Sequence, residues 1–294
     1  TVQGGIGTSG EAQRMIEDFG CDSTGWGSPF LLVPEATCVD DDTLNLLINA
    51  RKEDLYLSSA SPLGVPFNNL RNTGSENWTK DRAEKGKPGS PCPKGFLISD
   101  KQYTDKPICT ASRQFQKNKF DEITSMQIPE SEKDELKESW YVKVCLCDHL
   151  ANGSLIKLGI SPKAKSPQSI CPGPNIVWFN RQYSLAEMTD HIYGRGESLV
   201  PADRPHMFCQ EVELYVNYFK NLVKTMGTTD AEIKYLEVFK ENLEKGIEYI
   251  LEISEGTAYP NENLKSIPDL VKVQHDRLKS IYAERNQISI AVNF

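Results

Sequence analysis

Hydrophobic positions follow different spacings in different parts of the chain. In the C-terminal third, apolar residues recur with helical spacing over three stretches, residues 207–226, 231–253 and 269–283. Such stripes predict long amphipathic helices that pack against one another. In the first 60 residues, short apolar runs alternate with helical patterns instead, the clearest of which covers residues 11–19. This alternation of strand and helix is typical of an α/β fold.

The middle of the chain has no sustained period. Residues 61–180 are rich in proline and glycine and hold most of the cysteines, and only residues 130–140 predict a helix. A long irregular stretch of this kind is usually functional or disordered, and its cysteines and aromatic residues argue against disorder. The pattern therefore predicts three segments, namely α/β elements over 1–60, an irregular cysteine-containing segment over 61–180 and a helical region over 181–294.

Composition narrows the classes of function. Hydrophobic residues make up 38% of the 294 positions, charged residues 25%, and the formal net charge is −8. No apolar run approaches the roughly 20 residues of a transmembrane helix. An acidic chain without a basic stripe is a poor match for nucleic acid or an anionic membrane. We therefore expect a cytoplasmic protein that binds a small-molecule substrate, and oligomer formation stays open.

Two glycine turns are the strongest motif. Gly4-Gly5-Ile6-Gly7 follows what reads as the end of a strand, a helical pattern comes next, and Gly25-Trp26-Gly27-Ser28 ends a second short strand that is expected from Asp22. Glycines after a strand let backbone N–H groups approach an anion closely, and the next helix directs its positive end to the same point. In (β/α)8 barrels, the loops after strands seven and eight form such a phosphate site. The spacing predicts the C-terminal part of a (β/α)8 (TIM) barrel.

This arrangement resembles the end of the nitronate monooxygenase (2-nitropropane dioxygenase-like) family. The resemblance covers about residues 1–36 and rests on the Gly-Gly-Ile turn, Cys21-Asp22, the second glycine turn and Glu35-Ala36. IMP dehydrogenase-like and glutamate synthase-like barrels share the plan less closely. The resemblance implies that the FMN phosphate is held by Gly4, Gly5, Ile6, Gly27 and Ser28. Ser28 stands where the family has threonine and keeps the hydroxyl, whereas Pro29 removes an amide donor.

The resemblance implies an FMN-dependent oxidoreductase, in which the flavin does the chemistry and the protein positions it. The chain opens on what reads as the end of a buried strand, so we expect it to be the C-terminal part of such an enzyme, with the catalytic groups on strands upstream. Two alternatives stay open. One is a non-redox barrel enzyme that binds a phosphorylated substrate at the same turns, and the other is a metal-stapled helical interaction module.

Five cysteines of the irregular segment are candidate metal ligands. They are Cys92, Cys109, Cys145, Cys147 and Cys171, and Cys92 and Cys171 precede prolines. Four thiolates hold Zn2+ or a [4Fe–4S] cluster, and a cysteine followed by proline occurs among cluster ligands. No C-x2-C pair is present, so buried reduced thiols and disulfides remain alternatives. His149, two residues after Cys147, is a further candidate ligand or proton donor.

Overall fold

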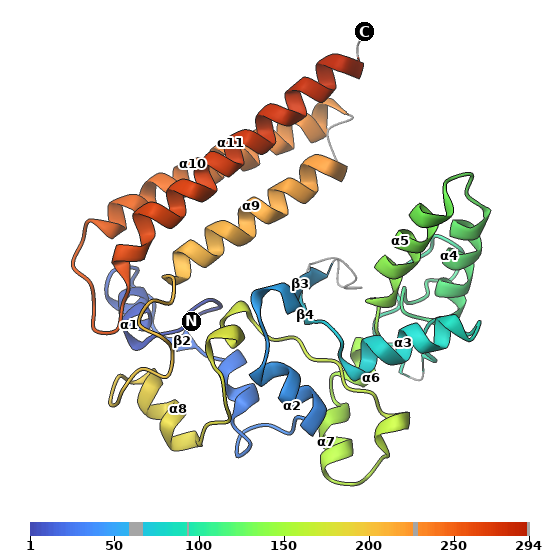
Figure 1. The fold of residues 1–294 in the computed structure, drawn as a ribbon, viewed down its shortest axis with the longest axis horizontal. Coiled ribbons are helices and arrows are strands. Elements are labelled where there is room, and N and C mark those ends of the chain that lie inside the picture. The colour runs from blue at the N-terminus through green and yellow to red at the C-terminus, as the bar shows by residue number, and fades with distance from the viewer. Residues whose placement is uncertain (59–66, 93, 226–228, 293–294) are drawn as a thin grey trace. The chain divides into compact units, whose positions relative to one another are not determined.

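The computed structural model describes every residue except 59–66, 93, 226–228 and 293–294 (Figure 1). The structure is 56% helical and 6% strand. It divides into two compact units, each described here by itself. The terminal unit combines residues 1–26 with residues 186–294, and the central unit spans residues 27–185. In the described part of the chain, no helix combines the length and the apolarity needed to cross a lipid bilayer.

The terminal unit begins with one strand–helix–strand motif and ends in long helices. Its elements are β1 (Val2–Gln3), α1 (Ser9–Glu17), β2 (Thr24–Gly25), α8 (Leu185–Ile192), α9 (Met207–Thr225), α10 (Asp230–Ser254), the short 3-10 helix η5 (Leu264–Ser266) and α11 (Ile267–Val292). The helices expected over residues 11–19, 207–226, 231–253 and 269–283 are confirmed as α1, α9, α10 and α11, although α11 continues beyond its expected end to Val292.

The first motif has the parallel topology expected of a βαβ unit. β1 and β2 pair in parallel, with Val2 opposite Thr24 and Gln3 opposite Gly25, and α1 makes the crossover between them. The helix begins where the sequence supplies a cap, because the Thr8 hydroxyl accepts a hydrogen bond of 3.2 Å from the backbone N–H of Glu11. The carboxyl end of β1 therefore leads directly into the first glycine turn.

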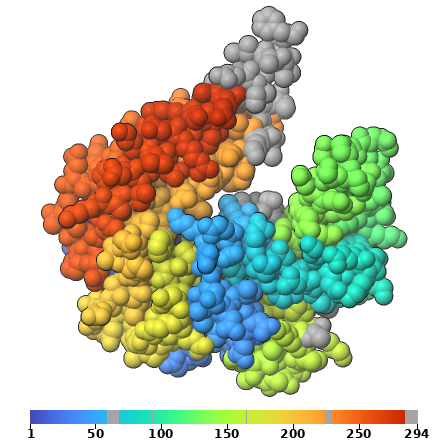
Figure 2. Space-filling view, in the orientation of Figure 1, coloured from blue at the N-terminus to red at the C-terminus, as the bar shows by residue number. Residues whose placement is uncertain are grey.

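The core of the terminal unit lies between α9, α10 and α11. Their apolar stripes bury one cluster that includes Val216, Phe219, Leu236, Ile247 and Val271. The ring of Phe219 stacks on Phe239 with centroids 5.8 Å apart. Figure 2 shows the outer surface of these helices as the orange-to-red region. Burial of the three stripes explains why helical periodicity predicted these elements correctly.

The central unit is built from short elements. They are η1 (Ser28–Leu32), α2 (Asp41–Ile48), η2 (Lys52–Asp54), β3 (Leu55–Ser58), β4 (Phe67–Leu70), α3 (Gly74–Glu84), α4 (Arg113–Ser125), α5 (Glu130–Tyr141), α6 (Leu146–His149), α7 (Asn152–Lys157), η3 (Lys163–Lys165) and η4 (Pro174–Trp178). The helix expected over residues 130–140 is confirmed as α5, and α2 is one of the helices that were expected to alternate with short apolar runs in the first 60 residues. α3 and α4 fall where no element was expected from the pattern.

The α/β barrel prediction holds only in part. One parallel pair, β1 and β2, is present, but β3 pairs antiparallel with β4, Leu55 opposite Leu70. The described residues contain no closed barrel, and helices far outweigh strands. The middle segment is also more helical than its sequence suggested, since α3 and α4 present too few apolar positions for their period to stand out. The compact units cut across the three expected segments, because both ends of the chain belong to one unit.

Candidate functional site

The first glycine turn has a backbone that favours glycine at two consecutive positions. Gly4 and Gly5 have φ angles of +102° and +71°, in the left-handed region that side chains with a Cβ rarely adopt. A Cβ added to Gly4 would meet no atom within 4 Å, so the space beside this residue is open. The turn thus provides a backbone that favours glycine, with room for close approach, at the end of a parallel strand.

Two buried side chains fix the carbonyl groups of this turn. Arg204 Nη2 donates to the Gly5 carbonyl oxygen at 3.0 Å, and His191 Nε2 lies 3.1 Å from the Gly7 carbonyl oxygen. Burial lowers the pKa of His191, while its contact with Gly7 acts in the opposite direction. Since His191 Nδ1 accepts from the Leu199 N–H at 3.1 Å, Nε2 is the atom that carries the proton toward Gly7.

The start of α1 is occupied by a carboxylate of the protein itself. Glu11 accepts from the Gly7 and Met207 backbone N–H groups, each at 2.7 Å, and forms a buried 2.7 Å ion pair with Arg204. The Thr8-x-x-Glu11 spacing is a capping signal that sequence reasoning could have used. Because Glu11 already takes the Gly7 amide, the helix end is less available to a phosphate than the sequence suggested.

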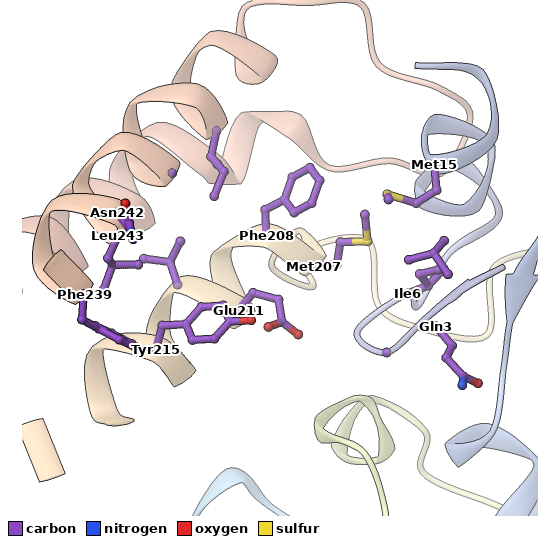
Figure 3. Close-up of a pocket in the computed structure, with 15 residues that line it drawn as sticks. Gln3, Ile6, Met15, Met207, Phe208, Glu211, Tyr215, Phe239, Asn242 and Leu243 are labelled. Carbon is purple, nitrogen blue, oxygen red and sulfur yellow. The ribbon is translucent and has the colours of Figure 1, made fainter. Parts of the chain in front are cut away.

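The turn lines a pocket of about 720 Å³ in the terminal unit. Figure 3 shows Met15, Met207 and Ile6 gathered at the end near the turn, while Phe239 and Leu243 of α10 border the other end. The wall between the two ends comes from α9. The full lining consists of Val2, Gln3, Gly4, Ile6, Met15, Met207, Phe208, Glu211, Val212, Tyr215, Phe239, Asn242, Leu243, Gly246 and Ile250. Most of this surface is apolar, and a few polar groups interrupt it.

Glu211 is the ionisable carboxyl group of the pocket wall. It projects from α9 beside Tyr215, and a Cβ on Gly5 would lie 3.3 Å from its Oε1 atom. Burial raises the pKa of Glu211 above the usual carboxyl value. The nearby Glu211 carboxylate in turn raises the pKa of Tyr215, and burial adds to this effect. Together these shifts indicate that the pocket disfavours uncompensated negative charge on its own walls.

The second glycine turn is divided between the units, with Gly25 and Trp26 in the terminal unit and Gly27 and Ser28 in the central unit. Gly27 has a φ of −111°, which other residues adopt easily, and it caps the 3-10 helix η1. The Ser28 hydroxyl oxygen accepts a 2.6 Å hydrogen bond from the Gly173 N–H, so this hydroxyl has a structural partner. Of the five residues expected to hold a phosphate, Gly4, Gly5 and Ile6 therefore share one site, whereas Gly27 and Ser28 belong to the central unit.

The cysteines expected to bind metal are free thiols. Cys109 and Cys145 are buried, Cys147 is partly buried, and Cys92 and Cys171 are exposed. Within the described residues, no three histidine, cysteine or acidic side chains are placed to coordinate one ion. The Cys171 thiol has a partner of its own, because it forms a hydrogen bond with the backbone of Asn68.

His149 occupies a buried structural position. Its Nδ1 lies 2.5 Å from the Ser75 hydroxyl oxygen, and its ring packs edge-on against Trp78 with centroids 5.3 Å apart. Burial lowers its pKa to about 4, which keeps the imidazole neutral at physiological pH. These contacts favour a packing role over the ligand or proton-donor role considered from the sequence.

Comparisons with protein-family models, with curated proteins and with solved structures find no match to this chain.

Proposed function

We propose that the chain is part of an FMN-dependent oxidoreductase and that its first glycine turn holds the flavin phosphate. One observation carries this proposal. The Gly4–Gly5 turn combines left-handed backbone with open space, stands at the carboxyl end of a parallel strand, and lines the pocket. Parallel α/β folds bind phosphate at this kind of position. When bound, FMN accepts and returns a hydride or electrons.

The pocket suits a ligand with an apolar body. Its volume of about 720 Å³ falls within the range of small-molecule sites, roughly 300–1,000 Å³. Met15 and Met207 add flexible, polarisable side chains that adapt to a planar ring or an alkyl group. The few polar groups in the wall, Glu211 and Asn242 among them, supply directional hydrogen bonds. Such a lining fits an aromatic cofactor better than a bare sugar phosphate.

The acid beside the turn limits how a phosphate is bound. An ionised Glu211 would repel a phosphate, whereas its protonated form can donate a hydrogen bond to one. Burial raises the pKa of Glu211, which favours the protonated form. Arg204 and His191 hold the Gly5 and Gly7 carbonyl oxygens, so these carbonyls are already satisfied. The phosphate would therefore rely on the backbone of the turn.

The test compares FMN with riboflavin, which lacks the phosphate. The 294-residue chain is titrated with FMN and, separately, with riboflavin while flavin fluorescence is followed. We expect FMN to bind at least about 10-fold more tightly, since charge-assisted hydrogen bonds contribute about 1.5–3 kcal/mol. Gly4→Asp places a carboxylate at the turn and should abolish this preference. Gly20→Asp is the matched control, because Gly20 also has a positive φ, +64°, and open space around it.

The outcomes separate the remaining alternatives. Equal affinity for FMN and riboflavin, unchanged in Gly4→Asp, would contradict phosphate binding at the turn. Binding of a sugar phosphate without any flavin would favour the non-redox barrel enzyme. Circular dichroism of both glycine variants verifies that a loss of binding does not come from unfolding.

A further inference from the structure

Two long helices wall the pocket of the terminal unit, each with one of its faces. Along α9, Met207, Glu211 and Tyr215 follow one another at intervals of four residues and so share a face. The lining residues of α10 also recur with helical spacing, and they are Phe239, Asn242, Leu243, Gly246 and Ile250. Figure 3 shows Tyr215 and Phe239 at the end away from the glycine turn, with Glu211 between them and the turn. Helical spacing thus puts the Glu211 carboxyl group on a mostly apolar wall.

The Glu211 carboxyl group lacks a partner within the protein. It makes neither a hydrogen bond nor an ion pair with any residue that the structure describes. Two other buried acids of the same unit do have partners, since Glu11 pairs with Arg204 and Glu262 pairs with Arg14. A charge in apolar surroundings is costly unless another group compensates it. A ligand is the group that can supply the missing partner of Glu211.

Gly246 leaves space in the wall that α10 contributes. It lies in the interior of the helix, where glycine is a poorer helix former than alanine. Its φ is outside the left-handed region, and an added Cβ would meet no atom within 4 Å. Neither the backbone nor close packing among the described residues therefore requires glycine here. The missing side chain instead widens the pocket between α9 and α10.

Aromatic rings accompany the carboxyl group. Tyr215 stands one turn of α9 beyond Glu211, and Phe239 of α10 lines the same end of the pocket. The face of an aromatic ring attracts cations, and its body buries apolar surface. Tyr215 is 49% exposed, so this end of the pocket is accessible to a ligand. A carboxylate with aromatic neighbours is a combination that recognises a positively charged amine with an apolar substituent.

We propose that this end of the pocket binds an apolar amine in its protonated, cationic form. The ammonium group donates to the Glu211 carboxylate beside the Tyr215 ring. The apolar substituent lies against Phe239 and Leu243, in the space that Gly246 leaves. An anionic ligand would add to the negative charge of Glu211, and a neutral one would leave that charge without a counter-ion, so a cation is the best match.

The amine is compatible with a flavin phosphate at the glycine turn. The Oε1 atom of Glu211 lies 3.3 Å from the position of a Cβ added to Gly5, so an ionised and unpaired Glu211 would repel that phosphate. Burial raises the pKa of Glu211, and a cation bound to its carboxylate opposes this effect. An ammonium group thus offers a second way to remove the repulsion. This relation to the flavin rests on the proposed function, whereas the amine site does not.

The test compares three ligands that share one apolar body. The flavin-free 294-residue chain is titrated with 4-phenylbutylamine, 4-phenylbutanol and 4-phenylbutyrate at neutral pH, and isothermal titration calorimetry measures binding. We expect the amine to bind at least about 10-fold more tightly than the alcohol, and the carboxylate to bind most weakly. Glu211→Gln removes the charge at nearly constant shape and should abolish the preference for the amine. Glu241→Gln, at an exposed position of α10 outside the pocket lining, is the matched control and should retain it.

Gly246→Leu tests where the apolar substituent lies. Its Cβ meets no atom within 4 Å and leucine is a good helix former, so the chain should stay folded, which circular dichroism verifies. The new side chain fills the pocket and should weaken binding of the amine and of the alcohol alike.

Three results would overturn the proposal. They are equal affinity for the amine and the alcohol, a preference for the amine that persists in Glu211→Gln, and no binding of the amine at all. Because flavin is absent from these titrations, their failure is distinguishable from a failure of FMN to bind more tightly than riboflavin.

Discussion

At the scale of single residues, the stability of the terminal unit depends on buried charged side chains that form ion pairs. Glu262 is the clearest case, because its carboxylate accepts from Arg14 Nε at 2.5 Å and lies 3.0 Å from His206 Nε2. Burial alone would raise the pKa of Glu262, but the bonds from His206 and Arg14 outweigh it and lower the pKa to about 2. The carboxylate therefore contributes stability above its ordinary pKa, and this contribution is lost as pH falls toward 2.

Replacing Glu262 by glutamine should strongly destabilise the chain. The variant leaves the buried Arg14 guanidinium with Asp18 as its remaining carboxylate partner, and removing one member of a buried pair costs about 3–5 kcal/mol. Urea unfolding at neutral pH, followed by circular dichroism, measures the change. Glu241→Gln, at an exposed position of α10, is the matched control and should stay within about 0.5 kcal/mol of the wild type. An equal effect of both substitutions would contradict this account.

His149 should make the central unit sensitive to acid. Because burial lowers its folded pKa to about 4 from an ordinary value of 6.5, the unfolded chain binds a proton that the folded chain does not over this interval. The free energy of unfolding should therefore fall as pH drops from about 6.5 to about 4, by up to roughly 3 kcal/mol. The measurement is the difference in unfolding free energy between pH 7 and pH 5.

His149→Gln removes this titrating group and should reduce the pH dependence of the unfolding free energy. His275→Gln, in the terminal unit, should leave it as in the wild type. A pH dependence that is equally steep in His149→Gln would assign the effect to other groups.

The partners of buried polar and charged side chains were the hardest features to predict from the sequence. The glycine turn could be recognised because Gly4 and Gly5 follow what reads as the end of a strand and precede a helical pattern. Glu11 gave a weak capping signal, but its partner Arg204 is remote in sequence and carried no pattern at all. The five cysteines were recognised as a set, yet their spacing could not show which of them are buried.

At the scale of elements, the link between the glycine turn and α1 is tightly packed at one position. A Cβ on Gly7 would overlap the Arg204 guanidinium, which also holds Glu11 and the Gly5 carbonyl. Adding one methyl group therefore forces either the turn or the arginine to move. The requirement for glycine at this point comes from space, since Gly7 does not have a positive φ.

Gly7→Ala should destabilise the chain by about 1–3 kcal/mol, the usual cost of overpacking, and should weaken binding at the turn. Gly246→Ala is the contrasting control. Gly246 lies inside α10 with no atom within 4 Å of an added Cβ, so alanine should stabilise the helix by about 0.5–1 kcal/mol. Thermal and urea unfolding of both variants measure these changes. Effects of the same sign would show that the Gly7 position is less crowded than described.

Helices were predicted correctly where their apolar residues form a long, continuous stripe. α9, α10 and α11 bury one continuous face against one another, so their period survives in the sequence. α3 and α4 contribute isolated anchors instead, such as Phe115, whose ring packs beside Trp140 with centroids 5.5 Å apart. One or two buried apolar side chains per helix leave no recognisable helical period in the sequence. The single parallel pair was predicted correctly, but its continuation into a barrel was an extrapolation from two turns.

At the scale of the whole molecule, no pattern in the sequence indicated that residues 1–26 and 186–294 form one unit. Contacts such as the ion pair between Arg14 and Glu262 span almost the full chain and follow no local pattern. The central unit, residues 27–185, is by contrast continuous in sequence. The predicted boundaries at residues 60 and 180 followed composition, whereas the compact units follow long-range packing.

This arrangement has a consequence during synthesis on the ribosome. Residues 1–26 emerge before the central unit, but the helices that complete their own unit come from residues 186–294. At translation rates of about 5–20 residues per second, the last segment alone needs on the order of 10 s. During that interval Glu11 and Arg14 lack Arg204 and Glu262, while the central unit is already free to fold. Residues 1–26 thus leave the ribosome before the central unit yet reach their native environment after it, which prolongs their exposure to chaperones and proteases.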